Sequence, residues 1–259
     1  MSQQVLKPVS EVSWQNIRLI ASDMDGTLTQ TEKFDSRLFQ TLTKLAKRGI
    51  EVLIVTGRSA GWVQAIATYL PVVGAIAENG GLFYGRDNIK PQLMTPLDID
   101  LHRQQLSQVF KLLQEKFPIL EESPDNRFRL TDWTFEVEGL SLEDLKQIEQ
   151  ICQSEGYGFT YSTIQCHIKL LHQDKAYALN KVIEQYFPQL KPEEIVTVGD
   201  SPNDESLFDS KQFPLSVGVA NVIKYRDRLN YLPHYVTNGS EVAGFCELAA
   251  LITAKNNRA

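Results

Sequence analysis

Two short segments of the chain each place two aspartates directly after an apolar run. Residues 23–27 (DMDGT) follow the run IRLIAS, and residues 199–204 (GDSPND) follow the run EIVTV. In an extended segment, side chains two residues apart point to the same side, so Asp23 and Asp25 are expected to face one site while Met24 turns away. The sequence therefore predicts a site with several carboxylates.

A site that gathers Asp23, Asp25, Asp200 and Asp204 must offset their mutual repulsion. Two like charges about 4 Å apart repel by about 4 kcal/mol at an effective dielectric constant near 20. Such a cluster is tolerable with a bound cation, with some carboxyl groups protonated, or with hydrogen-bond donors nearby. Oxygen ligands favour a hard ion, and few protein ligands with room for water favour Mg²⁺ over Ca²⁺. A Ca²⁺-binding EF-hand is excluded, because Phe34 stands at the twelfth position from Asp23, where that loop needs Glu.

Further polar residues stand where other predicted elements begin or end. Thr56, Gly57 and Arg58 follow the apolar run EVLIV, and Lys175 opens a predicted helix. Gly57 alone indicates only a turn, and Arg58 is interpreted as a surface residue at a helix start. Asn79, in the segment ENGG, is either a turn residue or a ligand, and both interpretations stay open.

The elements expected to position these residues alternate between strand and helix. Buried strands are predicted at 17–22, 51–55, 72–77, 194–198 and 215–219, and helices at 34–48, 175–187 and 240–252, with a further helix that Pro71 ends. This alternation, with short connections, predicts an α/β fold in which helices cover both faces of a parallel sheet. In such sheets ligands bind at the carboxyl ends of the strands, where the polar residues stand.

Residues 83–171 follow a different pattern. Helices are predicted at 97–116 and 141–155, and strands that alternate polar and apolar residues at 127–137 and 158–170. We therefore predict a core domain of residues 1–82 and 172–259, with residues 83–171 inserted as an α+β domain. Trp133 is interpreted first as a core residue of this insertion and His167 as a structural strand residue, although either could face a substrate.

The composition excludes several classes of protein. The chain has 259 residues, of which 42% are hydrophobic and 22% charged, and a net charge of −6. These values exclude a collagen-like or disordered chain, and the acidic balance does not favour nucleic acid as a partner. Three cysteines without CxxC spacing are expected to be reduced, and no apolar run is long enough for a membrane span or a signal peptide. We expect a cytoplasmic protein without a nucleic-acid, membrane or obligate protein partner.

In their order along the chain, DMDGT at 23–27, Thr56, Lys175 and GDSPND at 199–204 resemble the four motifs of the haloacid dehalogenase (HAD) superfamily. The resemblance covers the chain from about residue 17 to residue 252. The two aspartate motifs that follow buried strands are the most specific evidence for the resemblance. Thr56 and Lys175 are common residues and support it only because they occur in the expected order. The resemblance implies a Rossmann-like core and phosphoryl transfer through an aspartyl-phosphate.

The resemblance also implies roles for the aspartates. Asp23 would be the nucleophile that attacks phosphorus, and Asp25 the general acid and then the general base. Asp25 would need a raised pKa, so its side chain is expected off the metal. Mg²⁺ would be held by Asp23, the backbone carbonyl of Asp25 and Asp200, with Asp204 supporting its water shell.

The remaining motif residues would bind the phosphoryl group of the substrate. The groups expected to do so are Thr56, Gly57 and Lys175, with Asn203 orienting Lys175 or the phosphate. Lys175 is followed by Ala176, where many relatives have Gly. Lys169 and Lys181 therefore stay as lesser candidates for the phosphate-binding lysine.

The position of the insertion indicates which subgroup of the superfamily the chain resembles. It lies between the Thr56 and Lys175 motifs, where C2 caps occur, and its α+β pattern and ENGG at 78–81 resemble the C2B type. C2B members that this chain resembles include Cof-type sugar-phosphate phosphatases, sucrose-phosphate and mannosyl-3-phosphoglycerate phosphatases, and phosphomannomutase. The implied function is a Mg²⁺-dependent phosphatase of a small phosphorylated metabolite, most simply a sugar phosphate. A phosphosugar mutase with the same chemistry and a non-catalytic sensor of a phosphorylated ligand are the alternatives.

Overall fold

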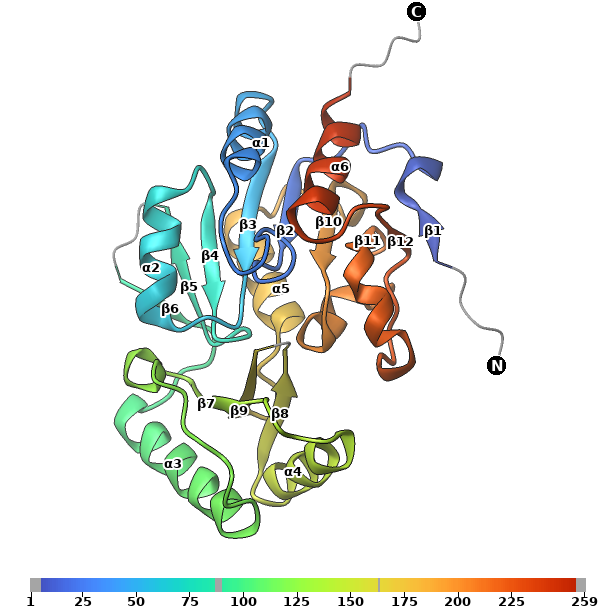
Figure 1. Cartoon of the computed structure of the whole chain (residues 1–259). Coiled ribbons are helices and arrows are strands. Elements are labelled where there is room, and N and C mark those ends of the chain that lie inside the picture. Colours follow the sequence, from blue (N-terminus) through green and yellow to red (C-terminus); the bar gives the residue numbers. More distant parts are fainter. Residues whose placement is uncertain (1–5, 87–89, 163, 255–259) are drawn as a thin grey trace, which may run out of the picture.

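The structure, a computed structural model that describes residues 6–86, 90–162 and 164–254, consists of two layered parts of unequal size (Figure 1). The larger part is built on a nine-stranded sheet in the order β1-β12-β11-β10-β2-β3-β4-β5-β6. Its strands are β1 Lys7–Pro8, β2 Leu19–Ser22, β3 Glu51–Val55, β4 Gly74–Ala77, β5 Leu82–Gly85, β6 Gln92–Leu93, β10 Ile195–Gly199, β11 Ser216–Gly218 and β12 Tyr235–Val236. The smaller part is built on a three-stranded sheet in the order β7-β9-β8. Its strands are β7 Asp132–Glu136, β8 Tyr157–Tyr161 and β9 Gln165–Leu170.

Helices cover both sheets. The α-helices are α1 Ser36–Lys47, α2 Ala60–Tyr69, α3 Ile99–Lys116, α4 Leu142–Ser154, α5 Lys175–Tyr186 and α6 Glu241–Thr253. Short 3₁₀ segments are η1 Val9–Glu11, η2 Asn126–Phe128, η3 Pro192–Glu194, η4 Pro202–Phe208 and η5 Ala220–Arg228. In the described part of the chain, no helix is both long and apolar enough to cross a membrane.

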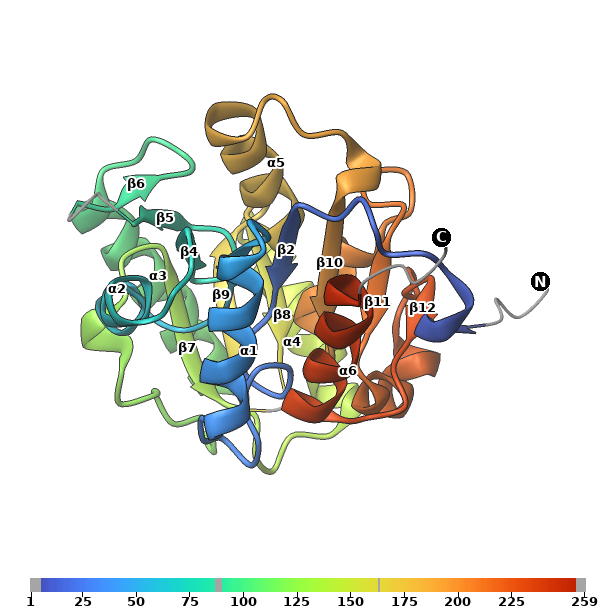
Figure 2. The ribbon, with the colours of Figure 1, turned by 90° about the horizontal axis from the view of Figure 1, so that it is seen from above.

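The central strands of the larger sheet are apolar on both faces, and each face packs against its own helices. Ile20 and Val52 belong to a buried cluster with α1, α2 and α6, whereas Leu19 and Leu53 belong to a second cluster with α5. Figure 2 shows α5 on the side of the sheet opposite to α1 and α6. Burial on both faces is what near-continuous apolar strands of a parallel sheet require.

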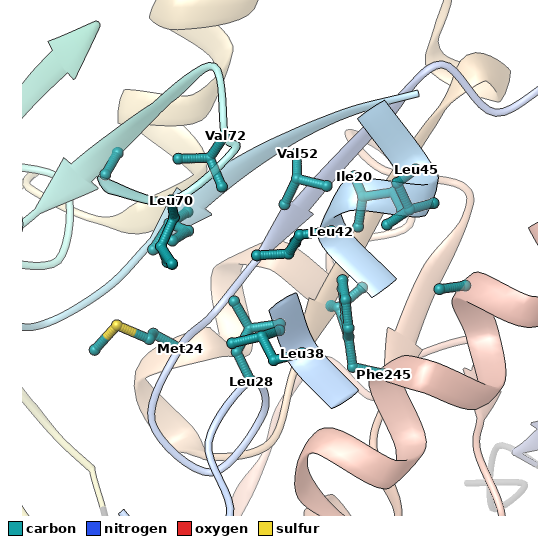
Figure 3. Packing of buried hydrophobic residues seen from close by; sticks show 14 of the residues in the cluster. Ile20, Met24, Leu28, Leu38, Leu42, Leu45, Val52, Leu70, Val72 and Phe245 are labelled. Carbon is teal, nitrogen blue, oxygen red and sulfur yellow. The ribbon is translucent and has the colours of Figure 1, made fainter. Parts of the chain in front are cut away.

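Helix α1 shows how sequence spacing produces this packing. Leu38, Leu42 and Leu45 recur at helical spacing and are wholly buried. They lie over Ile20 and Val52 of the sheet (Figure 3). The apolar stripe that the sequence indicates is therefore the stripe that attaches α1 to the sheet.

Parallel pairing brings the ends of the central strands to one edge. Strands β10, β2, β3 and β4 run parallel, and Val198, Ser22 and Ile54 stand level across β10, β2 and β3. The residues that follow these strands, including Asp23 and Asp200, therefore lie at the same edge, and the smaller part lies beyond that edge (Figure 1). These observations confirm the predicted fold class, a Rossmann-like α/β core with an inserted α+β cap.

The prediction is wrong in part of the inserted region. One strand was expected over 158–170, but β8 and β9 form an antiparallel pair. The strand expected over 127–137 begins as the 3₁₀ segment η2, and β7 starts only at Asp132. Polar and apolar residues alternate through both β8 and β9, so the alternation gave no sign of the turn between them.

The larger sheet continues in the chain beyond residue 83. Strands β5 and β6 pair antiparallel with β4 and with each other, so they extend the larger sheet. We propose that the cap, expected over 83–171, starts between β6 and α3 and ends after β9, and that the rest of the chain forms the core.

Candidate active site

Three of the four predicted carboxylates meet at the edge of the core sheet. Asp23 follows β2, Asp200 follows β10, and Asp204 lies in η4. All three are buried, and each offers an oxygen within 4.8 Å of the others. The fourth, Asp25, is not part of this cluster.

Asp204 supports the cluster from behind. Its Oδ2 accepts hydrogen bonds from the backbone amides of Asp200 and Ser201, at 2.8 and 3.1 Å. Its Oδ1 pairs with Lys175 Nζ at 2.5 Å. Gly199 makes room for this carboxylate, since a Cβ there would stand 2.5 Å from Asp204 Cβ. With both oxygens engaged, Asp204 fits a supporting role better than that of a direct metal ligand.

Only one of the two carboxylate oxygens of Asp23 has a hydrogen-bond partner among the described residues. Its Oδ1 pairs with Lys175 Nζ at 2.6 Å, whereas its buried Oδ2 has no hydrogen-bond partner among the described residues. Burial, followed by the charge of Asp204, raises the pKa of Asp23 to about 7. An unpaired buried carboxylate oxygen is costly, so this position calls for a cation or a proton.

Burial and neighbouring charges also shift the pKa values of Asp200 and Lys175, the residues around Asp23. Burial and the charge of Asp23 raise the pKa of Asp200 well above its ordinary value. Burial lowers the pKa of Lys175, but the Asp204 and Asp23 carboxylates outweigh it, so the net shift is upward. One lysine thus neutralises only part of the charge of three carboxylates.

The donor set fits a divalent cation. All the groups are carboxylate oxygens, and Oδ2 of Asp23 is buried without a hydrogen-bond partner among the described residues. Asn221 Nδ2 donates to Asp200 Oδ2 at 2.7 Å, and Thr27 Oγ1 donates to Asp200 Oδ1 at 3.5 Å, so the Asp200 carboxylate is held in place. Oxygen-only sites of this kind suit Mg²⁺. Asn221 is not among the residues predicted for the site, although it follows β11 at the same sheet edge as the motif residues.

Asp25 is held by an arginine that the sequence analysis interpreted as a surface residue. Arg58 Nη2 and Nε donate to the two oxygens of Asp25 at 2.6 and 2.9 Å. The guanidinium also lies 5.4 Å from the ring centroid of Trp62. Arg58 is therefore part of the site, and its place directly after Thr56 and Gly57 is the signal that could have identified it.

The predicted phosphate-binding residues lie around this pair. Thr56 is buried, and its Oγ1 accepts from the Arg58 amide at 3.1 Å. Asn203 Nδ2 donates to Asn79 Oδ1 at 3.1 Å. Asn203 Oδ1 accepts from Ser201 Oγ at 2.8 Å, so the side chain of Asn203 is held by Asn79 and Ser201 instead of Lys175. Asn79 lies at φ 52°, in the left-handed region, which brings its side chain beside Gly57.

The other two candidate lysines lie away from the carboxylates. Lys169 Nζ donates to the carbonyl of Gln173, and Lys181 Nζ donates to the carbonyl of Met94 at 2.7 Å. Of the three candidates, only Lys175 contacts Asp23.

A pocket opens between core and cap at Asp23 and Asp25. Six lining residues come from the core, namely Asp23, Asp25, Gly57, Arg58, Ser201 and Asn203. Four come from the cap, namely Ser162, Ile164, Gln165 and His167. Trp133 is not among them. It packs on Phe110, with the Arg103 guanidinium over its ring, as a cap core residue would.

Buried polar contacts join cap and core beside the pocket. Arg129, from the cap, donates to the Gly57 carbonyl at 2.9 Å and pairs with Asp132 at 3.0 Å. On the core side, Glu78 accepts from the amides of Ala60 and Thr131 at 2.8 and 2.6 Å. Burial, followed by the charge of Asp132, raises the pKa of Glu78 to about 7.

Known proteins resemble this chain in sequence and in fold. A family model described as haloacid dehalogenase-like hydrolase matches residues 20–132. The phosphoglycolate phosphatase of Thermoplasma acidophilum is 28% identical over 194 residues, which cover 74% of this chain and 81% of that protein. Among solved structures, a protein of Thermoplasma acidophilum (0175) aligns with a TM-score of 0.73 at 24% identity, covering 91% of this chain and 99% of that one. The sucrose-phosphatase of Synechocystis, solved with sucrose and phosphate, aligns with a TM-score of 0.66 at 16% identity, covering 92% and 98%.

The fold is that of an α/β core with an inserted cap, and the similar proteins with names are phosphatases. Residues 20–132 match the haloacid dehalogenase-like hydrolases, and the chain shares its fold with solved structures that include a sucrose-phosphatase. The predicted family and the predicted enzyme class, a phosphatase, are confirmed.

Proposed function

We propose that this protein is a Mg²⁺-dependent phosphatase that hydrolyses a small phosphorylated metabolite through an aspartyl-phosphate on Asp23. The observation that carries the proposal is the buried cluster of Asp23, Asp200 and Asp204, in which one lysine offsets three carboxylates and one oxygen has no partner among the described residues. Asp23, Asp200 and the backbone carbonyl of Asp25 would hold the ion, with Asp204 behind them. Bound Mg²⁺ would neutralise negative charge on the carboxylates and on the phosphoryl oxygens.

In the first half of the reaction, the Asp23 carboxylate attacks phosphorus and the bond from phosphorus to the leaving oxygen breaks. Asp25 gives its proton to that oxygen. In the second half, Asp25 takes a proton from water as the water oxygen attacks phosphorus, and the bond to Asp23 breaks to release phosphate. The contact with Arg58 keeps the Asp25 side chain facing the pocket and away from the buried cluster.

The remaining motif residues bind and orient the phosphoryl group. Lys175, fixed between two carboxylates, supplies positive charge next to the nucleophile. The hydroxyl of Thr56, the amide of Gly57 and the side chain of Asn203 are the further groups we assign to phosphoryl oxygens. Positioning and charge neutralisation of this kind account for most of the catalysis of phosphoryl transfer.

The substrate that we propose first is a sugar phosphate, as the resemblance implies. One structural neighbour is a sucrose-phosphatase, and this chain is similar to it in fold alone. The second candidate is phosphoglycolate, because relatives from several archaea bear the name phosphoglycolate phosphatase.

The test is phosphate release from a panel of sugar phosphates and phosphoglycolate, with Mg²⁺ and with EDTA. We expect turnover that needs the metal and is abolished in Asp23→Asn, while Asp100→Asn, an exposed carboxylate of the cap, behaves as wild type. An active Asp23→Asn variant would refute the nucleophile assignment. An isomeric sugar phosphate in place of free phosphate would identify a mutase.

A further inference from the structure

The cap contributes a buried histidine to the wall of the pocket. His167 on β9 is 2% exposed, and its Nδ1 lies 2.8 Å from Asp132 Oδ2. It lines the same pocket as Asp23 and Asp25. A Cβ placed on Gly57 would stand 3.2 Å from Cε1 of the ring, the atom between the two nitrogens. Among the residues that the structure describes, none forms a hydrogen bond with Nε2.

The orientation of this ring is fixed by buried charges. Both Asp132 oxygens lie 3.0 Å from Nη1 of Arg129, and the side chains of Asp132 and Arg129 are wholly buried. The same Nη1 donates to the carbonyl of Gly57. Arg129, Asp132 and His167 thus form one connected set that attaches the cap strands to Gly57 of the core.

The charge state of the set determines what Nε2 can bind. Burial lowers the pKa of His167, and the nearby charges of Arg129 and Lys175 lower it further against the opposing effect of Asp132. Burial raises the pKa of Asp132, but Arg129 and His167 outweigh it, so this carboxyl stays ionised. An ionised Asp132 accepts a hydrogen bond from Nδ1–H, which leaves Nε2 of the neutral ring as an acceptor. An acceptor at this position binds a hydroxyl and repels a carboxylate.

We propose that His167 is a specificity-determining residue whose Nε2 accepts a hydrogen bond from a hydroxyl of the substrate's leaving group. The pocket would thereby select phosphate esters of sugars and other polyols over esters whose leaving group presents only a carboxylate. This inference rests on the proposed phosphatase function and decides between its two substrate candidates. It also assigns a binding role to a residue that its strand position alone does not distinguish.

The experiment compares esters of similar size in wild-type protein and in His167→Asn. The probes are glycerol 3-phosphate, propyl phosphate, which lacks hydroxyls, and phosphoglycolate, with p-nitrophenyl phosphate as a reference. Asparagine can still donate to Asp132 but has no group at the position of Nε2. His172→Asn is the matched control, because His172 is exposed and lies outside the pocket.

We expect wild type to prefer glycerol 3-phosphate over both propyl phosphate and phosphoglycolate in kcat/KM. In His167→Asn, kcat/KM for glycerol 3-phosphate should fall about 10- to 100-fold, the loss that one unpaired hydrogen bond in a buried site causes. The values for propyl phosphate and p-nitrophenyl phosphate should change less than about threefold, since neither presents a leaving-group hydroxyl.

Each other outcome overturns the inference in a recognisable way. An equal fall on all esters would identify a purely structural role for His167. Wild-type preference for phosphoglycolate would refute hydroxyl recognition even if the variant failed to fold. Absence of phosphate release from every ester by wild type would instead refute the proposed function itself.

Discussion

Replacing Asp23 by asparagine should stabilise the metal-free protein at pH 8, although the change removes one carboxylate partner of Lys175. The pKa of Asp23 rises from its ordinary 3.8 to about 7 in the folded chain, first because of burial and then because of Asp204. Since the folded-state pKa lies above the unfolded one, the stabilising contribution of this group is present below pH 4 and is lost as the pH rises through 7. A shift of this size corresponds to about 4 kcal/mol at full ionisation.

The asparagine amide carries no charge, so most of the free-energy cost of a buried ionised carboxylate is absent in the variant. Lys175 keeps its ion pair with Asp204 at 2.5 Å. We therefore expect the free energy of unfolding of Asp23→Asn to exceed that of wild type by about 2–4 kcal/mol at pH 8, and by little near pH 4. Glu78, whose pKa burial also raises to about 7, makes both proteins less stable with rising pH, so only the difference between them is diagnostic.

The assay is urea unfolding in EDTA from pH 4 to 9 for wild type, Asp23→Asn and Asp100→Asn. The last variant removes an exposed negative charge and should follow the wild-type curve. If the stability difference between wild type and Asp23→Asn did not change with pH, the argument that Asp23 is buried at an electrostatic cost would be refuted.

Three further predictions concern the ion, the arginine and a glycine. Mg²⁺ at a hundred times its dissociation constant should stabilise wild type by about 2.7 kcal/mol and should leave Asp200→Asn nearly unchanged in thermal unfolding. Arg58→Met should lower kcat about 10- to 100-fold for an alkyl phosphate and far less for p-nitrophenyl phosphate, whose leaving group needs no proton from Asp25; equal losses would contradict the positioning of Asp25 by Arg58. Gly26→Ala should cost about 1–3 kcal/mol more than Gly139→Ala in urea unfolding, because both lie at φ 82° but only at Gly26 would the new Cβ meet Asp200 Oδ2, at 2.6 Å.

The sequence could place the motif aspartates at one edge of the sheet because the apolar runs before them can be read from the sequence and predict parallel strands. Each follows an apolar run, and parallel pairing then brings the ends of those runs to one edge. The same reasoning selected Lys175, whose place at the start of α5 brings it to Asp23.

Side-chain pairs between residues far apart in the chain could not be predicted from the sequence. Arg58 and Asp25 are 33 residues apart, and their pairing depends on how two neighbouring loops turn after their strands. His167 and Asp132 are 35 residues apart and meet only because β7 pairs with β9. The segment between β8 and β9 contains no Gly, Pro, Asn or Asp, and its one turn-forming residue is Ser162, whose Oγ accepts from the amides of Ile164 and Gln165. Serine marks a turn more weakly than those residues, which is why one strand was predicted there.

The carboxylate of Glu78 couples the unfolding of the cap to the unfolding of the core, because it accepts hydrogen bonds from both parts. It accepts hydrogen bonds from the amide of Ala60 in the core and from the amides of Leu130 and Thr131 in the cap. A cap that melted alone would leave this buried group with a single donor, and would also release Arg129 from Gly57. Cap and core, despite separate hydrophobic clusters, should therefore unfold in one cooperative transition.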